Sequence, residues 1–256
     1  MTASSGMQNA TRVVQTIEYL AEHGSGRIED IADLLGVHKS SASRLLATLR
    51  TCGWVVSNPS RTRFTLGPRL VRIGQAALPE VQIERAIQLA TDLRELTDET
   101  VHVSVPDPSS HQMVVVARVD SKDPLRVTQP VGSFDPLHST AVGKVYLASL
   151  TSEELEREFE EMGTLDRYAS QTITSKKRLL RDLELVRSRG YALNLGESRL
   201  GIAAAAVLLR FSEYGSVVAL SITGPASRWT AEAIESAMPS VLKYVDQYRV
   251  RFDSDS

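Results

Sequence analysis

The residue types that most often carry enzymatic chemistry do not stand in the patterns that catalysis needs. His138 and Ser139 pair a base with a hydroxyl, but adjacent side chains seldom face each other, so we interpret His138 as a structural histidine at a helix start. Gly143-Lys144 lacks the glycine five residues earlier that a phosphate-binding loop needs, because that position is His138. The sequence contains no Gly-x-Ser-x-Gly, His-Glu-x-x-His or Gly-x-Gly-x-x-Gly motif. We therefore expect no catalytic residues.

Metal-ligating residues are also sparse. The five histidines show no spacing to carboxylates that resembles a metal site, and the single cysteine, Cys52, excludes an internal disulfide. Cys52 stands beside apolar residues, so we expect it to be packed rather than reactive. The acids from Glu153 to Glu161 alternate with Leu155 and Phe159, which predicts a solvated helix face. We expect neither a bound metal nor a cofactor.

Basic residues gather near the N-terminus. The 256-residue chain has a net charge of −2, but residues 1–75 hold nine basic and five acidic residues and carry +4, which leaves −6 for the remainder. The stretch 36–79 contains seven basic residues and no acid. This asymmetry suggests a partner for the basic part, and nucleic acid is the first candidate. A solvated basic surface is the alternative.

The elements under this charge follow a helix-turn-helix pattern. Apolar residues at helical spacing predict helices at 13–21 and 28–35, and Gly36 ends the second helix. A third helix begins near His38 and ends at Gly53. Two helices joined by a tight glycine turn, the second of them basic, are typical of helix-turn-helix DNA-binding domains.

The exposed face of the third helix is suited to DNA. A recognition helix needs short side chains that enter the major groove and donors for phosphates and base edges. The segment 54–66 reads as a β-hairpin, which we interpret as a wing along the DNA backbone. The predicted DNA-contacting residues are Lys39, Ser40, Ser41, Ser43 and Arg44 on the helix and Arg61 and Arg63 on the wing. A three-helix module for protein contacts is the alternative.

The rest of the chain alternates helices and strands. We expect a linker helix at 68–78, followed by a two-layer α/β domain with a mainly antiparallel sheet. The predicted strands are 101–105, 113–119, 125–131, 191–195, 203–210 and 216–223. The predicted helices are 81–98, 138–150, 152–162, 175–189 and 230–248.

Several short segments occur in the same order as in one known family. They are Val37–Leu49 with Gly53, Phe64–Gly67, Leu137–Lys144, Gly190–Ala192 leading to Glu197, Gly201–Val207, and Val218–Pro225 with Arg228. Together they resemble the IclR family of bacterial transcription regulators over roughly residues 9–248. Two positions depart from the family pattern, since Ile202 and Ala206 stand where cysteine and proline are frequent.

The resemblance implies an α+β protein of three parts. These are a winged helix-turn-helix domain at 1–67, a linker helix at 68–79 and a GAF-like α/β effector-binding domain at 80–256. It also implies homodimers, often paired into tetramers, on palindromic operators in double-stranded DNA. The implied effector is a small metabolite, often a carboxylate or an aromatic acid. Ile202 makes the pocket floor more apolar, which disfavours a small polar acid such as glyoxylate.

A candidate effector site lies where the helix after residue 138 opens. Backbone N–H groups at the start of a helix and the positive end of its dipole suit a ligand carboxylate. The predicted effector residues are Ser139, Thr140, Ala141, Glu197, Ile202, Ser221 and Thr223, with His102 and Arg118 added from their strand positions. The alternative is that the hydroxyl groups only satisfy local backbone groups.

The composition fits a globular protein without a membrane partner. Hydrophobic residues make up 42% of the chain, no apolar run reaches the roughly 18 residues of a membrane span, and the first ten residues lack signal-peptide features. The expected location is the cytoplasm. We predict a DNA-binding regulator that senses a small metabolite. The alternatives are an enzyme that transforms a small acid and carries an N-terminal interaction module, or a regulator whose effector site has been lost.

Overall fold

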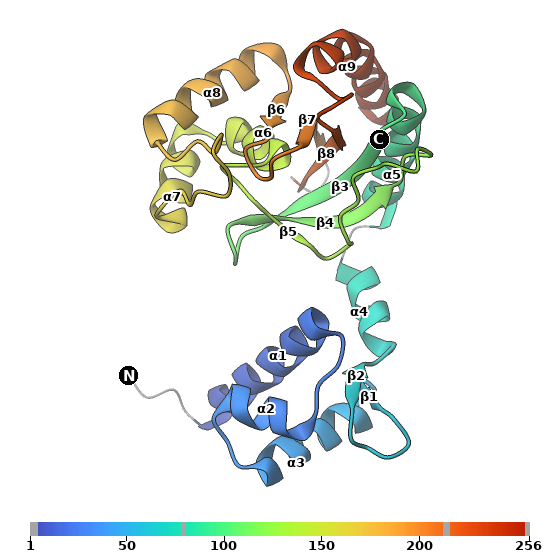
Figure 1. The fold of residues 1–256 in the computed structure, drawn as a ribbon, viewed down its shortest axis with the longest axis vertical. Coiled ribbons are helices and arrows are strands. Elements are labelled where there is room, and N and C mark those ends of the chain that lie inside the picture. Colours follow the sequence, from blue (N-terminus) through green and yellow to red (C-terminus); the bar gives the residue numbers. More distant parts are fainter. Residues whose placement is uncertain (1–4, 78–79, 212–215, 254–256) are drawn as a thin grey trace. The chain divides into compact units, whose positions relative to one another are not determined.

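The computed structural model describes residues 5–77, 80–211 and 216–253. The chain divides into two compact units, 1–80 and 81–256, which are described separately below (Figure 1). The predicted domain boundaries at 67 and 79 stay predictions, and residues 78 and 79 lie outside the described residues. Within the described ranges, no helix combines the length and the apolar character needed to cross a membrane.

The N-terminal unit is a helix-turn-helix domain with a small hairpin. Its elements are α1 (Ser5–His23), α2 (Ile28–Leu35), α3 (Lys39–Thr51), β1 (Val55–Ser57), β2 (Phe64–Leu66) and α4 (Arg69–Ala77). The predicted helices are confirmed, although α1 begins earlier than expected. Gly36 ends α2 in the left-handed conformation, with φ of 60°. Cys52 is exposed, so its predicted packing is wrong, because it lies at the C-cap of α3 beyond the buried residues Leu46 and Leu49.

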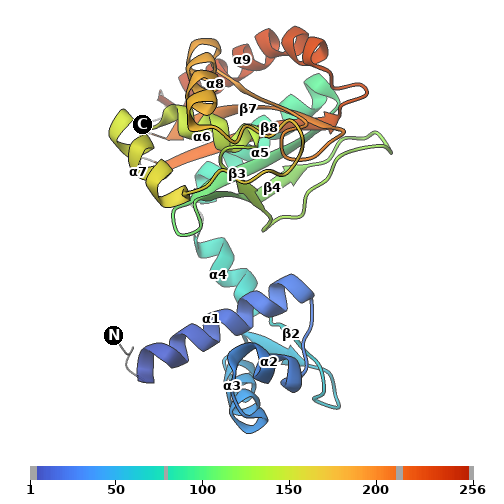
Figure 2. The ribbon, with the colours of Figure 1, turned by 60° about the vertical axis from the view of Figure 1, so that its left-hand side comes forward.

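The hairpin is fixed by its own polar residues. β1 and β2 pair antiparallel, and the Asn58 side chain accepts hydrogen bonds from the backbone N–H groups of Thr62 and Arg63. Phe64 also exchanges two backbone hydrogen bonds with Gly26, which ties the hairpin to the turn before α2. Figure 2 shows the hairpin beside the three helices. The wing therefore has a defined conformation against the helical core.

The C-terminal unit contains a six-stranded antiparallel sheet. Its strands are β3 (Thr100–Asp107), β4 (Gln112–Val119), β5 (Phe134–Pro136), β6 (Ala192–Leu195), β7 (Ile202–Phe211) and β8 (Ser216–Pro225). Their order is β5-β4-β3-β8-β7-β6, and every neighbouring pair is antiparallel. The predicted antiparallel sheet is confirmed.

Helices cover both faces of this sheet, so the expected two-layer arrangement is wrong. One face packs against α5 (Glu80–Thr97) and α9 (Ala231–Asp253), and the other against α6 (Ala141–Ser149), α7 (Ser152–Met162) and α8 (Lys176–Arg189) (Figure 1). The reason lies in β7. Ala203, Ala205 and Val207 belong to the first apolar core, while Ala204 and Ala206 belong to the second. A strand that is apolar on both faces must be covered on both.

The predicted strand at 125–131 is also wrong. The structure has no strand there, and β5 pairs with β4 in its place. Pro124 and Pro130 lack the backbone N–H that a strand donates to its neighbour. The segment is held by side chains instead, because Arg118 donates to the carbonyl of Gln129 and the N–H of Gln129 donates to Nε2 of His102.

Candidate DNA-binding surface and ligand pocket

One side of α3 is free of the core, and the predicted DNA-contacting residues of this helix lie there. Ala42, Leu46 and Leu49 are buried, whereas all five predicted residues on α3 are exposed (Lys39, Ser40, Ser41, Ser43 and Arg44). Nζ of Lys39 lies 3.0 Å from Oε1 of Glu29 in α2. The hydrogen bond that Lys39 donates to Glu29, together with the positive charge of Lys39, lowers the pKa of Glu29. The surface offers short hydroxyl side chains and one extended guanidinium.

Both predicted wing arginines are exposed. Arg61 lies at the tip of the loop in the left-handed region, with φ of 55°. Arg63 donates from Nη1 to Oγ of Ser25, 3.2 Å away, which directs it along the turn before α2. The two side chains are available to the phosphate backbone of a nucleic acid.

The start of α6 is shaped by two residues. Thr140 is the N-cap, and its Oγ1 accepts a hydrogen bond from the N–H of Gly143 and donates to the carbonyl of Pro136. A Cβ on Gly143 would lie 2.3 Å from backbone atoms of Leu137, so only glycine allows this close approach. Because the cap takes the Gly143 amide, the amides of Ala141 and Val142 are the ones at the helix start that a ligand can use.

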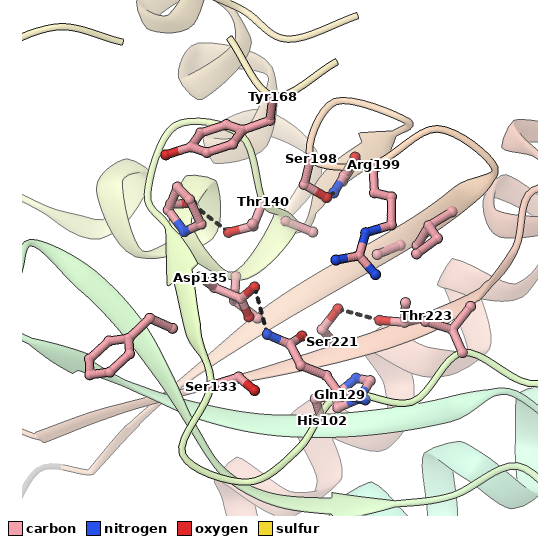
Figure 3. A pocket seen from close by; sticks show the side chains of 18 of the residues that line it. His102, Gln129, Ser133, Asp135, Thr140, Tyr168, Ser198, Arg199, Ser221 and Thr223 are labelled. Atoms are coloured by element: carbon pink, nitrogen blue, oxygen red, sulfur yellow. Dashed lines mark hydrogen bonds between the residues drawn. The ribbon is translucent and has the colours of Figure 1, made fainter. Parts of the chain in front are cut away.

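A pocket of about 560 Å³ opens in front of this helix start (Figure 3). It is bounded by α6, by strands β3, β7 and β8, and by the segment between β4 and β5. Five of the seven predicted effector residues line it, namely Thr140, Ala141, Ile202, Ser221 and Thr223. Ser139 and Glu197 do not line it. The hydroxyl groups of Ser221 and Thr223 lie 3.0 Å apart and are hydrogen-bonded to each other.

Two charged groups of the pocket were missed by sequence reasoning. Arg199, exposed on the loop before β7, and Asp135, on β5, enter the pocket from different sides (Figure 3). Within the described residues, Arg199 is in no ion pair. Asp135 accepts a hydrogen bond from Nε2 of Gln129, and burial raises the pKa of its carboxyl. Neither position follows a motif, and Asp135 lies on a strand that the sequence did not predict.

His102 forms part of the pocket wall as a neutral imidazole. It is buried on β3, and its Nε2 accepts a hydrogen bond from the N–H of Gln129, 3.2 Å away. Burial, aided by the charge of Arg118, lowers the pKa of His102 to about 4. Arg118 itself does not line the pocket.

Glu197 lies behind the pocket in a buried ion-pair cluster. Nζ of Lys144 is 2.6 Å from Oε1 of Glu197 and 2.8 Å from Oδ2 of Asp182. Burial raises the pKa of Glu197, and the Lys144 ammonium opposes that shift. The backbone of Glu197 is held as well, by Oγ1 of Thr172 and by the side chain of Asn194. Glu197 thus fixes the loop that carries Arg199.

The residues before α6 are structural. His138 hydrogen-bonds through Nε2 to the carbonyl of Asp166, 2.8 Å away, which confirms the interpretation of His138 as a structural histidine. Ser139 is buried, and its hydroxyl has no hydrogen-bond partner within the described chain. The hydrogen bond of the His138 imidazole therefore holds the segment that leads into α6.

Comparisons with known proteins agree with this geometry. The chain matches the family model described as bacterial transcriptional regulator IclR C-terminal over residues 75–249, and the IclR helix-turn-helix domain over residues 10–59. It is 28% identical to the transcriptional repressor IclR of Escherichia coli (strain K12), over 94% of this chain and 88% of that protein. It is 31% identical to the transcriptional regulator KdgR of the same organism, over 90% of this chain and 86% of that protein.

A solved structure shares the fold. The crystal structure of an IclR homolog from Microbacterium hydrocarbonoxydans, complexed with 4-hydroxybenzoate, superposes with a TM-score of 0.79, at 19% identity, over 94% of this chain and 99% of that chain. The two relatives from Escherichia coli are transcriptional regulators. Because the C-terminal family model alone matches more than half of the sequence, this chain belongs to the IclR family of DNA-binding transcription regulators with a C-terminal effector-binding domain.

Proposed function

We propose that the exposed side of α3 reads base edges of double-stranded DNA and that the wing contacts its phosphates. Arg44 reads a base, the three serines and Lys39 contact the groove and its backbone, and Arg61 and Arg63 contact phosphates. The exposure of every one of these side chains supports the assignment, as does the absence of acids in residues 36–79.

The regulator acts in the cytoplasm as a homodimer on a palindromic operator. A twofold-symmetric protein places two recognition helices one turn of DNA apart, which is the usual arrangement for this motif. The pocket binds its ligand without transforming it. The histidine of its wall, His102, is buried and neutral, and the hydroxyl groups of Ser221 and Thr223 are hydrogen-bonded to each other.

The effector is a small aromatic carboxylate. The observation that carries this proposal is the position of Arg199, which has no acidic partner in the described residues and enters the pocket that the start of α6 also faces. A guanidinium and two helix-start amides, those of Ala141 and Val142, suit a carboxylate. Ile202 and Ala204 provide apolar lining, and a volume of about 560 Å³ accommodates a ring.

A second polar group at the far end of the ligand fits the same pocket. Asp135 and Gln129 lie on the side away from Arg199 in Figure 3 and offer hydrogen-bond acceptors and donors. A hydroxyl on the ring donates to Asp135 or accepts from Gln129. The relative that was crystallised with 4-hydroxybenzoate bound a molecule of this type.

The experiment is a thermal-shift titration of the purified protein with 4-hydroxybenzoate, related aromatic carboxylates and the matching neutral amides. Carboxylates should raise Tm, because a ligand that binds only the folded state stabilises it, and amides should not. Arg199→Gln should remove the shift. Arg181→Gln, which changes an exposed arginine of α8 outside the pocket, should keep it. Equal shifts for acids and amides, or no binding of any acid, would refute the proposal.

A further inference from the structure

A cluster of three metal-ligating side chains lies outside both sites described above. His111 is in the turn between β3 and β4, and Glu158 and Glu161 are on α7. Nδ1 of His111 lies 3.0 Å from Oε1 of Glu158, and its Nε2 lies 3.6 Å from Oε2 of Glu161. One ring nitrogen and one oxygen from each carboxylate all lie within 4.8 Å of one another.

The charges in this cluster do not balance. Neither Glu158 nor Glu161 is ion-paired with a lysine or an arginine in the part of the chain that the structure describes. Two other acids of α7 have a defined structural partner. Glu154 belongs to the capping box at the start of the helix, and Glu156 is ion-paired with Lys176. The side chain of Glu158 is only 14% exposed. Two carboxylates that share one imidazole keep a net negative charge, which burial penalises and a divalent cation removes.

Local structure holds the three side chains in place. Asp107 accepts hydrogen bonds from the side chains of Ser109 and Ser110, which fixes the turn that presents His111. Glu158 and Glu161 are three residues apart on one helix, so they lie on the same side of it. The turn and the helix are thus two independent elements that meet at this point.

We propose that His111, Glu158 and Glu161 bind a divalent metal ion that accepts both nitrogen and oxygen ligands, such as Zn²⁺. One imidazole nitrogen and two carboxylate oxygens form a mixed donor set that suits Zn²⁺ and Mn²⁺, whereas Mg²⁺ and Ca²⁺ prefer oxygen donors alone. Bond lengths of about 2.0–2.2 Å place tetrahedral donors roughly 3.4 Å apart. The donors lie within 4.8 Å of one another and must approach by up to about 1.4 Å, which rotation of the side chains would supply, and water takes the remaining position.

No metal is expected from the sequence, because the ligands of this cluster are far apart along the chain. His111 and Glu158 are 47 residues apart, so no local spacing connects them. The site is also distinct from the effector pocket, because none of the three side chains lines that pocket. It is nevertheless adjacent to it, since Gln112, the next residue after His111, does line the pocket.

The test is calorimetric titration of the untagged, chelator-treated full-length protein with ZnCl₂, with MgCl₂ titrated in parallel. We expect one Zn²⁺ per chain, an increase in Tm that a chelator reverses, and no response to Mg²⁺ at the same concentration. His111→Gln and Glu158→Gln should each weaken Zn²⁺ binding at least about tenfold, as loss of a ligand does. Glu160→Gln removes an equal charge from the same helix and should leave binding unchanged.

A variant of Glu161 provides a second test if His111→Gln or Glu158→Gln fails to fold. Its side chain is 61% exposed, so Glu161→Gln should fold normally while still weakening Zn²⁺ binding. Absence of Zn²⁺ binding by the unmodified protein would overturn the proposal. Equal affinity and stoichiometry in His111→Gln and Glu161→Gln would overturn it too, because the ion would then lie elsewhere.

Discussion

Replacing Lys144 by methionine should strongly destabilise the effector-binding unit. The Lys144 side chain is 2% exposed and pairs with both Glu197 and Asp182, whose side chains are 11% and 21% exposed. Removing one partner of a buried ion pair costs about 3–5 kcal/mol, because the remaining charge stays buried. Asp182 retains some solvent and Glu197 can take up a proton, so we expect a loss near the lower end, about 3 kcal/mol.

The two tryptophans of the chain allow each unit to be followed separately. Trp54 lies in the N-terminal unit and Trp229 is buried in the effector-binding unit. In a Trp54→Phe background, urea unfolding monitored by the fluorescence of Trp229 reports on the second unit alone. Lys176→Met is the matched control, since its pair with Glu156 is exposed and should contribute less than about 1 kcal/mol.

The same measurement shows whether Lys144→Met lowers stability by leaving a buried charge unpaired or by removing packing contacts. Lys144→Met combined with Glu197→Gln removes one of the unpaired carboxylates and should recover part of the lost stability. The cost of Lys144→Met alone should also shrink at acidic pH, because protonation neutralises Glu197. A cost for Lys144→Met no greater than that for Lys176→Met would refute the reasoning, as would a double variant less stable than the single one.

Three further predictions follow from the described geometry. Arg44→Ala should weaken specific DNA binding by about 1–3 kcal/mol and relax sequence preference, whereas Arg63→Ala should weaken binding to all sequences about equally. Fluorescence anisotropy on operator and scrambled DNA distinguishes them, and the reverse pattern would show that the wing assignment is wrong. The pKa of His102 is about 4 in the folded state and about 6.5 when unfolded, so the unfolded state binds more protons between these values. The free energy of unfolding should therefore fall by up to about 3 kcal/mol as pH drops from about 6.5 to about 4, and a His102→Gln variant with the same pH profile would contradict this. Gly143→Ala should lower Tm, because its Cβ would meet backbone atoms at 2.3 Å, while Gly74→Ala in α4 meets nothing within 4 Å. Equal Tm values for the two alanine variants would contradict the close approach at α6.

The sequence predicts most of the fold because periodicity and charge are local properties. The helices of the N-terminal unit, the hairpin and the long strands β7 and β8 all follow from residues within one segment. The strand predicted at 125–131 was wrong because Pro130 within the segment and Pro124 just before it outweigh its apolar residues. The third layer was not predicted, although the alanines of β7 pack into an apolar core on each face of the sheet.

The ligand sites are harder to predict because their residues meet only in the folded chain. Thr140 is predicted from a helix start and Ser221 from its place on a strand that could face this helix, and both elements are predicted from local signals. Arg199 carries no such signal, and only the loop held by Glu197 brings it to the pocket. His111 and Glu158 are likewise brought together by the packing of α7 against the β3–β4 turn.

In a regulator with an effector-binding domain, a ligand in the pocket should change the affinity of the helix-turn-helix unit for DNA. The most direct measurement is the Kd of the full-length protein for DNA from its own upstream region, with and without an aromatic carboxylate that raises its Tm. We expect the ligand to change the Kd for DNA at least about fivefold in the unmodified protein and not to change it in Arg199→Gln. Ligand binding that leaves the Kd for DNA unchanged in the unmodified protein would contradict it.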